Sequence, residues 1–358
     1  MPISSILNPA QRIGKIKGMM LPHAIATTAL GAVGVNDNFK KNAGNQIVYR
    51  RALPRGATST QYNRFFQDGT GDRSAALANA YESSEGVTPA AETISMQDIT
   101  ATLKQFVIVC GYTDQAEDLH EDDLPAIYIQ YVGETQGLVN EANLFGVAKA
   151  CTNKFYGGTG NSRATVNGVL TINLLRRVAR SLMANNAKPI KSMQMLGKAG
   201  DYATSPIGKS FPVWIHTDLC ADVEQLEGYV RVHEYGDTSL AVPNEVGFCN
   251  PFRFIASPDL VEVQDAGAAI AGAVPALKST TGTSADVYQV IVGSQDAWGH
   301  LGLRKDMMKP SVLTPGTVDK SDPAGQRGLV SLKWYYHAVL LNSLQMAVVE
   351  VASRALTD

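Results

Sequence analysis

Two strand-forming runs separated by a long polar segment constrain this chain more than any other feature of its sequence. The runs are NQIVYRRAL at 45–53 and TATLKQFVIVCGY at 100–112, and both are rich in β-branched and aromatic residues. Residues 56–98 are rich in Gly, Ser, Thr, Asn and Asp. We predict an extended hairpin over 44–112. Because a lone two-stranded ribbon is marginal in water, we expect this hairpin to lie on a partner, and the chain to assemble.

The composition agrees with a globular protein that has much of its surface against other protein. Hydrophobic residues make up 45% of the 358 residues, but charged residues only 18%, against roughly 25% in typical soluble domains. The net charge of −2 gives no bulk attraction to nucleic acid. The cysteines at 110, 151, 220 and 249 have neither zinc-site nor disulfide-framework spacing, so we expect reduced, buried thiols. No apolar run has the ~18 residues that a membrane span needs.

The N-terminal half predicts an arm followed by two helices. Residues 1–43 contain small residues and few aromatics; GMMLPHAIATTALGAVGV hints at a signal peptide, but Pro22 and His23 interrupt it. Helical spacing predicts one long amphipathic helix over 123–151, about 40 Å in length. Its predicted apolar face is Ile127, Tyr131, Leu138, Ala142 and Phe145. A second helix is predicted over Ile172–Asn185.

After residue 190 the sequence indicates a compact sheet. Strands are predicted in 211–219, 248–261 and 286–294, with a flexible loop at 266–285. The segment 328–353 is predicted to form long strands around a bend at Asn342–Ser343. The whole chain is therefore predicted to be α+β.

The stretch DLHEDDLPA at 118–126 places His120 among four carboxylates and is the strongest candidate for a metal site. It approaches the zinc-protease pattern His-Glu-x-x-His, but Leu124 stands where the second histidine is needed. Acidic residues before a helix also stabilise its N-terminus, and Pro125 suits a first helical turn. We therefore interpret the cluster as a helix start, with a divalent cation site and a catalytic site as the alternatives.

Two glycine-containing segments approach nucleotide-binding patterns without matching them. ATSPIGKS at 203–210 has Ala203 in place of the first glycine of a phosphate-binding loop, and the residues that follow predict a strand instead of the required helix. GGTGNSR at 157–163 lacks the third glycine of a dinucleotide fingerprint and is interpreted as a turn. We expect no cofactor, no metal and no catalytic residues, so the chain is predicted not to be an enzyme.

One basic cluster lies on the predicted hairpin. Arg50, Arg51 and Arg55 could form a solvated strand face, or could pair with acidic residues of a neighbouring subunit, since arginine is favoured at interfaces for its fork of donors. We predict the second role, as intersubunit contact residues.

Five segments in order resemble a known family, the coliphage N-four-like major capsid proteins, which have the Hong Kong 97 type capsid fold of tailed phages. The resemblance covers about residues 45–355, whereas the arm and the loop 56–84 match nothing in it. The segments are EGVTPAAETISMQDITATLKQF (85–106), VWIHTDLCADV (213–223), NEVGFCNPFRFIASPDL (244–260), DVYQVIVGSQDAWG (286–299) and DPAGQRGLVSLKWYYHAVLLNSLQMAVVEV (322–351).

The resemblance implies a division of the chain into the parts of a capsid subunit. These parts are an N-terminal arm at 1–43, an extended hairpin loop at 44–112, a peripheral domain at 113–190 and 305–358 with its spine helix at 123–151, and an axial domain at 191–304. It also implies hexamers and pentamers in an icosahedral shell around double-stranded DNA, with scaffold and portal proteins as partners during assembly. DNA contact would be weak and non-specific, and the location would be the virion, assembled in the host cytoplasm.

Three other functions stay open at this point. An encapsulin-like bacterial compartment shell would share the fold. A divalent-metal hydrolase would use His120 and its carboxylates. A secreted adhesin would depend on the weak N-terminal signal.

Overall fold

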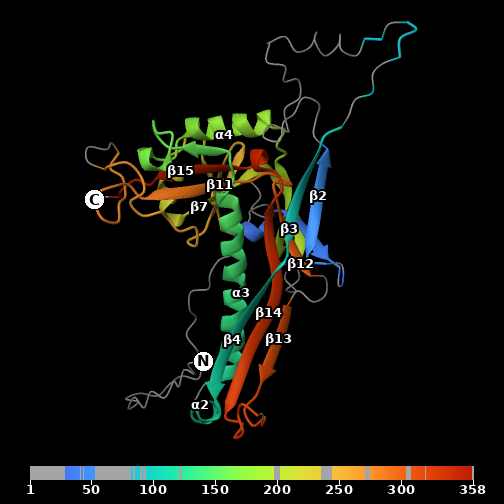
Figure 1. Cartoon of the computed structure of the whole chain (residues 1–358). Helices are drawn as coiled ribbons and strands as arrows, with labels where there is room; N and C mark the ends of the chain where they lie inside the picture. Colours follow the sequence, from blue (N-terminus) through green and yellow to red (C-terminus); the bar gives the residue numbers. More distant parts are fainter. Residues whose placement is uncertain are drawn as a thin grey trace.

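The computed structural model describes residues 29–40, 42, 44–52, 82–83, 85–88, 91, 94–120, 123–196, 202–234, 244–270, 275–303, 308–318 and 320–356. They form two β-sheets, a separate two-stranded ribbon and one long helix (Figure 1). Most of the predicted arm, most of the polar segment 56–98 and Arg55 lie outside the described residues.

The first sheet is long and narrow and is built around one strand, β14 (Arg327–Leu340). Strand β4 runs antiparallel to β14 over ten residue pairs, from Arg327 opposite Thr113 to Tyr336 opposite Lys104. Buried and half-buried residues alternate along most of β14, because only one face of this sheet is covered by the chain. The other strands are β1 (Val35–Phe39), β4 (Lys104–Thr113), β12 (Trp298–Leu303) and β13 (Met308–Leu313).

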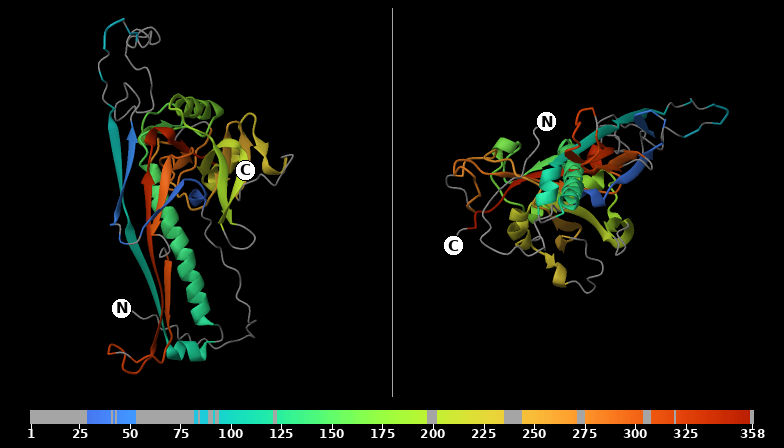
Figure 2. Two further views of the ribbon diagram at one scale, coloured as in Figure 1. Left: turned by 90° about the vertical axis from the view of Figure 1, so that its right-hand side faces the viewer. Right: turned by 90° about the horizontal axis from the view of Figure 1, so that it is seen from below.

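Helix α3 (Leu124–Lys149) covers the inner face of this sheet and confirms the helix predicted at 123–151. Its start is fixed by Asp123, whose carboxylate accepts a hydrogen bond from the Ala126 amide at 3.2 Å, and by a proline in the first turn. At ~1.5 Å per residue its 26 residues extend about 39 Å. Figure 2 shows α3 running alongside the strands of the first sheet.

The apolar face predicted for α3 is wrong in most of its members. Of the five predicted residues only Phe145 is buried, whereas Tyr131 and Leu138 are exposed. The buried residues of the helix are Leu124, Val132, Glu141, Leu144, Phe145 and Ala148. The physical reason is that apolar residues lie on more than one side of α3, so the periodicity did not select the side that meets the sheet.

The second sheet is mostly buried on both faces. Its strand order is β5-β15-β11-β7-β10-β9-β8, and β6 pairs with β7. Helix α4 (Ile172–Ala184) packs on one face, and the C-terminal turns of α3 pack on the other. The strands are β5 (Lys154–Tyr156), β6 (Ile190–Leu196), β7 (Tyr202–Ile215), β8 (Val230–Arg231), β9 (Glu245–Cys249), β10 (Phe252–Ala256), β11 (Val287–Val292) and β15 (Ala347–Ala352).

The predicted hairpin is present, but its return strand differs from the prediction. Strand β2 (Gln46–Ala52) pairs antiparallel with β3 (Met96–Thr102), while 104–113 is β4 and belongs to the first sheet. The change of partner occurs at Leu103, whose amide still bonds to the Asn45 carbonyl at 2.9 Å. Strands β4 and β3 consequently form an almost continuous line along the molecule (Figure 1). The run 100–112 was therefore two strands, a distinction that alternation alone does not reveal.

The boundaries predicted at 190/191 and 304/305 do not coincide with the boundaries of the sheets. Strand β15 pairs with β11, and α4 packs on the same sheet, so both belong with the second sheet. Strand β12 pairs with β14 and belongs with the first. The chain enters the second sheet earlier than predicted and returns to it after β14. Sequence order hides such a return, because strands distant along the chain become neighbours only in the folded protein.

Two further expectations concern the loop and the cysteines. The loop predicted to be flexible at 266–285 is fastened in its described part, since the Asp286 carboxylate accepts hydrogen bonds from the amides of Asp265 (2.9 Å) and Thr280 (3.2 Å). All four cysteines are free; Cys151 and Cys249 are buried and the other two half-buried. Among the helices of the described part, none combines the length and apolarity that crossing a bilayer requires.

The remaining elements are short. They are α2 (Asp114–Leu119), α5 (Cys220–Glu224) and the 3-10 turns η1 (Leu30–Ala32), η2 (Arg163–Thr165), η3 (Thr217–Leu219), η4 (Val232–Glu234) and η6 (Ser343–Gln345). The last of these forms the bend predicted at Asn342–Ser343.

Candidate subunit interface

The two described arginines of the predicted contact cluster lie on opposite faces of the β2–β3 ribbon. The register places Arg50 opposite Asp98 and Arg51 opposite Gln97. Arg50 binds Asp98 through two hydrogen bonds, Nε to Oδ1 at 2.8 Å and Nη2 to Oδ2 at 2.9 Å. These bonds lower the pKa of Asp98. Arg51 donates from Nη2 to the Gln97 side chain at 2.7 Å.

The structure thus gives Arg50 an acidic partner in its own chain, which sequence reasoning missed. The cross-strand pair is a consequence of register, and the prediction had placed the return strand four residues too late. Contact of Arg50, Arg51 and Arg55 with a neighbouring subunit stays a prediction.

The ribbon has one face fastened to the first sheet and one face free. On the fastened face Ile47, Tyr49 and Ile99 pack with Phe39, Leu301 and Val339. The Tyr49 hydroxyl donates to Asp37 at 3.2 Å, and burial together with that carboxylate raises the pKa of Tyr49 to about 12. On the free face Val48 and Met96 are each more than half exposed. The ribbon is therefore held rigidly at its base while presenting apolar side chains outward.

A second free apolar surface lies on the face of the first sheet that α3 does not cover. Val107 and Val109 of β4 project there with exposed fractions of 54% and 45%. Their neighbours across the ladder are Lys333 and Ser331 of β14. Two exposed valines on the same side of one strand make this face of the first sheet a candidate for contact with other protein.

Helix α3 also carries exposed apolar side chains. Ile129 and Tyr131 are each more than half exposed. Because these residues are two positions apart on a helix, they lie on different sides of it. The β2–β3 ribbon, β4 and α3 thus each present exposed apolar residues.

The segment Ala29–Val33 is fixed to the junction of the two sheets by buried polar groups. Glu141, in the middle of α3, accepts hydrogen bonds from the amides of Ala29 (2.8 Å) and Leu30 (2.6 Å). The indole of Trp214 donates to the Ala29 carbonyl at 3.1 Å, and that of Trp298 to the Val33 carbonyl at 2.6 Å. Burial raises the pKa of Glu141, although the amide donors act in the opposite direction.

The hydrogen bonds that hold Ala29–Val33 are called the Glu141 clamp below. The residue that follows this segment has to be glycine. Gly34 has φ of 130°, a conformation that L side chains rarely adopt. A Cβ at this position would approach Trp298 Cδ1 to 2.6 Å and His300 Nε2 to 2.8 Å. The backbone therefore passes directly against Trp298 and His300, whose ring nitrogens lie 2.6 Å and 2.9 Å from the Val33 carbonyl oxygen.

The acidic cluster around His120 is divided between the end of α2 and the start of α3. Asp118 lies in α2, His120 caps the C-terminus of α2, and Asp123 caps the N-terminus of α3. Glu121 and Asp122 lie outside the described residues. Over the described ranges, no group of three or more His, Cys, Asp or Glu side chains is placed to hold a metal ion. The segment 203–210 lies within β7, and the residues that follow it continue this strand, which confirms the strand predicted after it.

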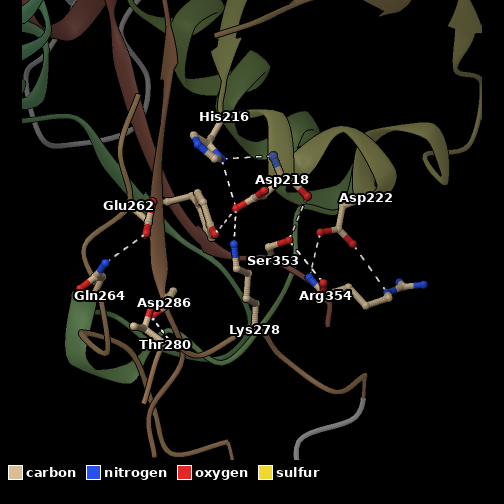
Figure 3. Close-up of polar contacts among 11 residues, drawn as sticks. His216, Asp218, Asp222, Glu262, Gln264, Lys278, Thr280, Asp286, Ser353 and Arg354 are labelled. Carbon is tan, nitrogen blue, oxygen red and sulfur yellow. Dashed lines mark hydrogen bonds and ion pairs between the residues drawn. The ribbon is translucent and has the colours of Figure 1, made fainter. Parts of the chain in front are cut away.

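A polar cluster that sequence reasoning missed joins η3, β11 and the C-terminal segment (Figure 3). The Asp218 carboxylate accepts from Lys278 Nζ at 2.5 Å and from the Tyr288 hydroxyl at 2.6 Å. Burial opposes ionisation of Asp218, but these two donors and His216 outweigh it and lower its pKa. Ser353 donates to the Asp218 carbonyl at 3.0 Å. The cluster fastens the loop before β11 to the start of η3.

Comparison with known proteins gives one consistent result. No family model matches the chain. The major capsid protein of Pseudomonas phage KPP21 is 23% identical over 182 residues, which are 48% of this chain and 45% of that protein. The chain thus aligns with less than half the length of this curated relative.

Solved structures with the same fold cover nearly the whole chain. A capsid chain of Ralstonia phage GP4 has a TM-score of 0.65 at 10% identity, with 100% of both chains covered. A chain of the cyanophage Pam1 capsid has a TM-score of 0.60 at 11% identity, covering 99% and 100%. A capsid chain of cyanophage P-SCSP1u has 0.56 at 13%, covering 95% and 93%. The predicted α+β capsid fold is confirmed by these three matches.

Proposed function

We propose that this chain is the major capsid protein of a tailed bacteriophage, a subunit that assembles into the icosahedral shell around double-stranded DNA. The observation that carries the proposal is the capsid fold combined with exposed apolar residues on three elements: the β2–β3 ribbon, β4 and α3. The relative from phage KPP21, named a major capsid protein, supports the same role.

Exposed apolar side chains are unfavourable in an isolated subunit, because water contacts them. Full burial of a valine or methionine side chain stabilises by about 1.5–3 kcal/mol, so covering each of these half-exposed side chains stabilises the assembled state by roughly half of that. Many weak contacts of this kind, repeated around symmetry axes, form a shell without any covalent step. The low charge of the chain, 18% of its residues, suits interfaces whose cores are depleted in charge.

The parts of the subunit follow from the sheets and stay a proposal. The arm leads to the clamp at Ala29–Val33, and the β2–β3 ribbon is the base of the extended loop. The first sheet with α2 and α3 forms the peripheral domain. The second sheet with α4 and α5 forms the axial domain, which meets its copies around five- and six-fold axes.

The remaining parts of the proposal concern partners and location. We expect hexamers and pentamers, with scaffold and portal proteins during assembly in the host cytoplasm, and the virion as the final location. The protein would act without catalysis, and no cofactor is expected. An encapsulin-like shell shares the fold, but the named relatives are phage proteins. Neither the hydrolase nor the adhesin gains support from any observation above.

Negative-stain microscopy of the purified full-length chain tests the proposal. Closed particles or regular capsomers are expected as protein concentration increases. A sample that sediments as a monodisperse monomer at every concentration and salt tried would overturn the shell function. The variant His120→Ala separates the hydrolase alternative, since a shell protein should assemble normally without that imidazole.

A further inference from the structure

Residues 142–200 have a charge distribution unlike that of the rest of the chain. They contain nine of the 31 Lys and Arg residues and no Asp or Glu. The other 299 residues hold 22 basic and all 33 acidic residues, so they are net negative by 11 while this segment is net positive by 9. Segregation of charge in a nearly neutral chain indicates a surface for an anionic partner.

Helix α4 gathers three of these basic residues into a row. Arg176, Arg177 and Arg180 are exposed, at positions i, i+1 and i+4 of the helix, and about 6 Å of helix rise separates the first from the last. The opposite side of α4 is buried against the second sheet through Leu174, Leu175, Val178, Ala179 and Leu182. Figure 1 shows α4 on the outside of that sheet, with its free side pointing away from α3.

The positive charge of these three arginines is only weakly neutralised by acidic residues in the described part of the chain. Arg176 approaches Glu227 to 4.0 Å, and both side chains are more than 60% exposed, so this pair contributes little. The Arg177 guanidinium lies 5.9 Å from the Phe155 ring centroid. Arg180 has no acidic side chain within 4 Å in the described structure. The exposed Lys154 of β5 and Lys188 after α4 extend the positive surface.

The chemistry of this surface favours a polyphosphate over a protein. Guanidinium groups bind phosphate oxygens through parallel hydrogen bonds, and a row of them suits successive phosphates of one strand. Protein interface cores are, by contrast, depleted of charge. We propose that the outer side of α4 binds the phosphate backbone of double-stranded DNA without sequence preference. This rests on the proposed shell function, and it places α4 on the wall that faces the packaged genome.

Fluorescence anisotropy of a labelled duplex of about 20 base pairs, titrated with the full-length unassembled chain at several salt concentrations, tests the proposal. The test variant is Arg176→Gln/Arg177→Gln/Arg180→Gln. The matched control, Lys40→Gln/Lys104→Gln/Lys209→Gln, removes the same charge from exposed lysines outside the segment. If each arginine contacts one phosphate, the slope of log K against log salt should become shallower by about 2.7.

The expected result is at least tenfold weaker binding at low salt for the arginine variant and a much smaller change for the control. Equal losses in both variants would assign the binding to net charge and overturn the proposal. Unchanged DNA binding with failed particle assembly would instead make the α4 surface a subunit contact.

Particle formation by the wild type is scored separately by negative stain, so a failure of the shell function is distinguishable from a failure at α4. A density map of the filled particle with α4 on its outer wall would also overturn the proposal.

Discussion

The Glu141 clamp makes the sharpest prediction, because one side chain holds two backbone amides in a buried place. The change Glu141→Ala removes the acceptor of the Ala29 and Leu30 amides, which lie 2.8 and 2.6 Å from Oε1. A buried donor left without a partner costs about 1–3 kcal/mol. The free energy of unfolding of the unassembled chain should therefore fall by about 2–6 kcal/mol, the upper part including the cavity left behind.

Glu141→Gln is the matched control. Glutamine keeps the oxygen that accepts from Ala29 and Leu30 and removes a buried carboxylate, although its amide group replaces the second oxygen by a donor. These effects oppose one another, so stability at neutral pH should stay within about 1 kcal/mol of wild type. The comparison separates loss of the acceptor from loss of the charge.

The pH dependence follows from the raised pKa of Glu141. Its ordinary value is 4.5, and burial places the folded value above that. Between these two values the folded state binds more protons than the unfolded state, so stability increases as pH falls through the window. The wild type should therefore gain stability relative to Glu141→Gln on acidification from neutral pH toward 4.5.

Urea unfolding of the three proteins, together with hydrogen exchange at the Ala29 and Leu30 amides, measures these effects. Faster exchange at both amides is expected in Glu141→Ala alone. If the alanine variant matched the glutamine variant in unfolding midpoint and amide protection, the clamp would not hold the arm and the reasoning would fail.

Three further predictions concern the free surfaces and the polar cluster. Val107→Asp should block particle formation, as seen by negative stain, and should leave the unfolding midpoint of the unassembled chain unchanged. The control variant Val107→Thr should still assemble. A lower unfolding midpoint for Val107→Asp would contradict a surface role for this residue. The double variant Arg50→Glu/Arg51→Glu should weaken assembly without reducing solubility. Adding Asp98→Arg should restore the ion pair between residues 50 and 98. It should not restore assembly if the arginines contact a neighbouring subunit. Asp218→Asn should lower the free energy of unfolding by about 1 kcal/mol at pH 7. Because the folded pKa of Asp218 lies below 3.8, this difference between variant and wild type should disappear as pH falls through the folded pKa. An equal decrease at pH 7 and at strongly acidic pH would contradict the ion-pair explanation.

Local pattern was sufficient to predict several elements. The long helix, the second helix, the buried strands and the bend near Asn342 all appear close to their predicted residues, because capping, apolar runs and turn residues act over a few positions. The capsid fold was predictable through five motifs in order. The helix-start interpretation of the acidic cluster was also correct at Asp123, which caps α3.

The same local signals failed wherever a long-range partner decided the outcome. The run 100–112 looked like one strand, but Leu103 divides it between the ribbon and the first sheet. The acidic partner of Arg50 follows from the register of that ribbon. The Asp218 cluster unites residues 60 and 70 positions apart, which no spacing rule connects.

Local sequence pattern was enough to locate most helices and strands, and the low share of charged residues indicated a surface that meets other protein. The folded structure was needed to show which side of α3 meets the sheet, that β15 pairs with β5, and that Glu141 binds the amides of Ala29 and Leu30. The reason is that secondary structure is selected by neighbours along the chain, whereas burial is selected by neighbours in space. A periodic apolar pattern predicts that one face of an element will be buried, but it does not identify the element that buries it.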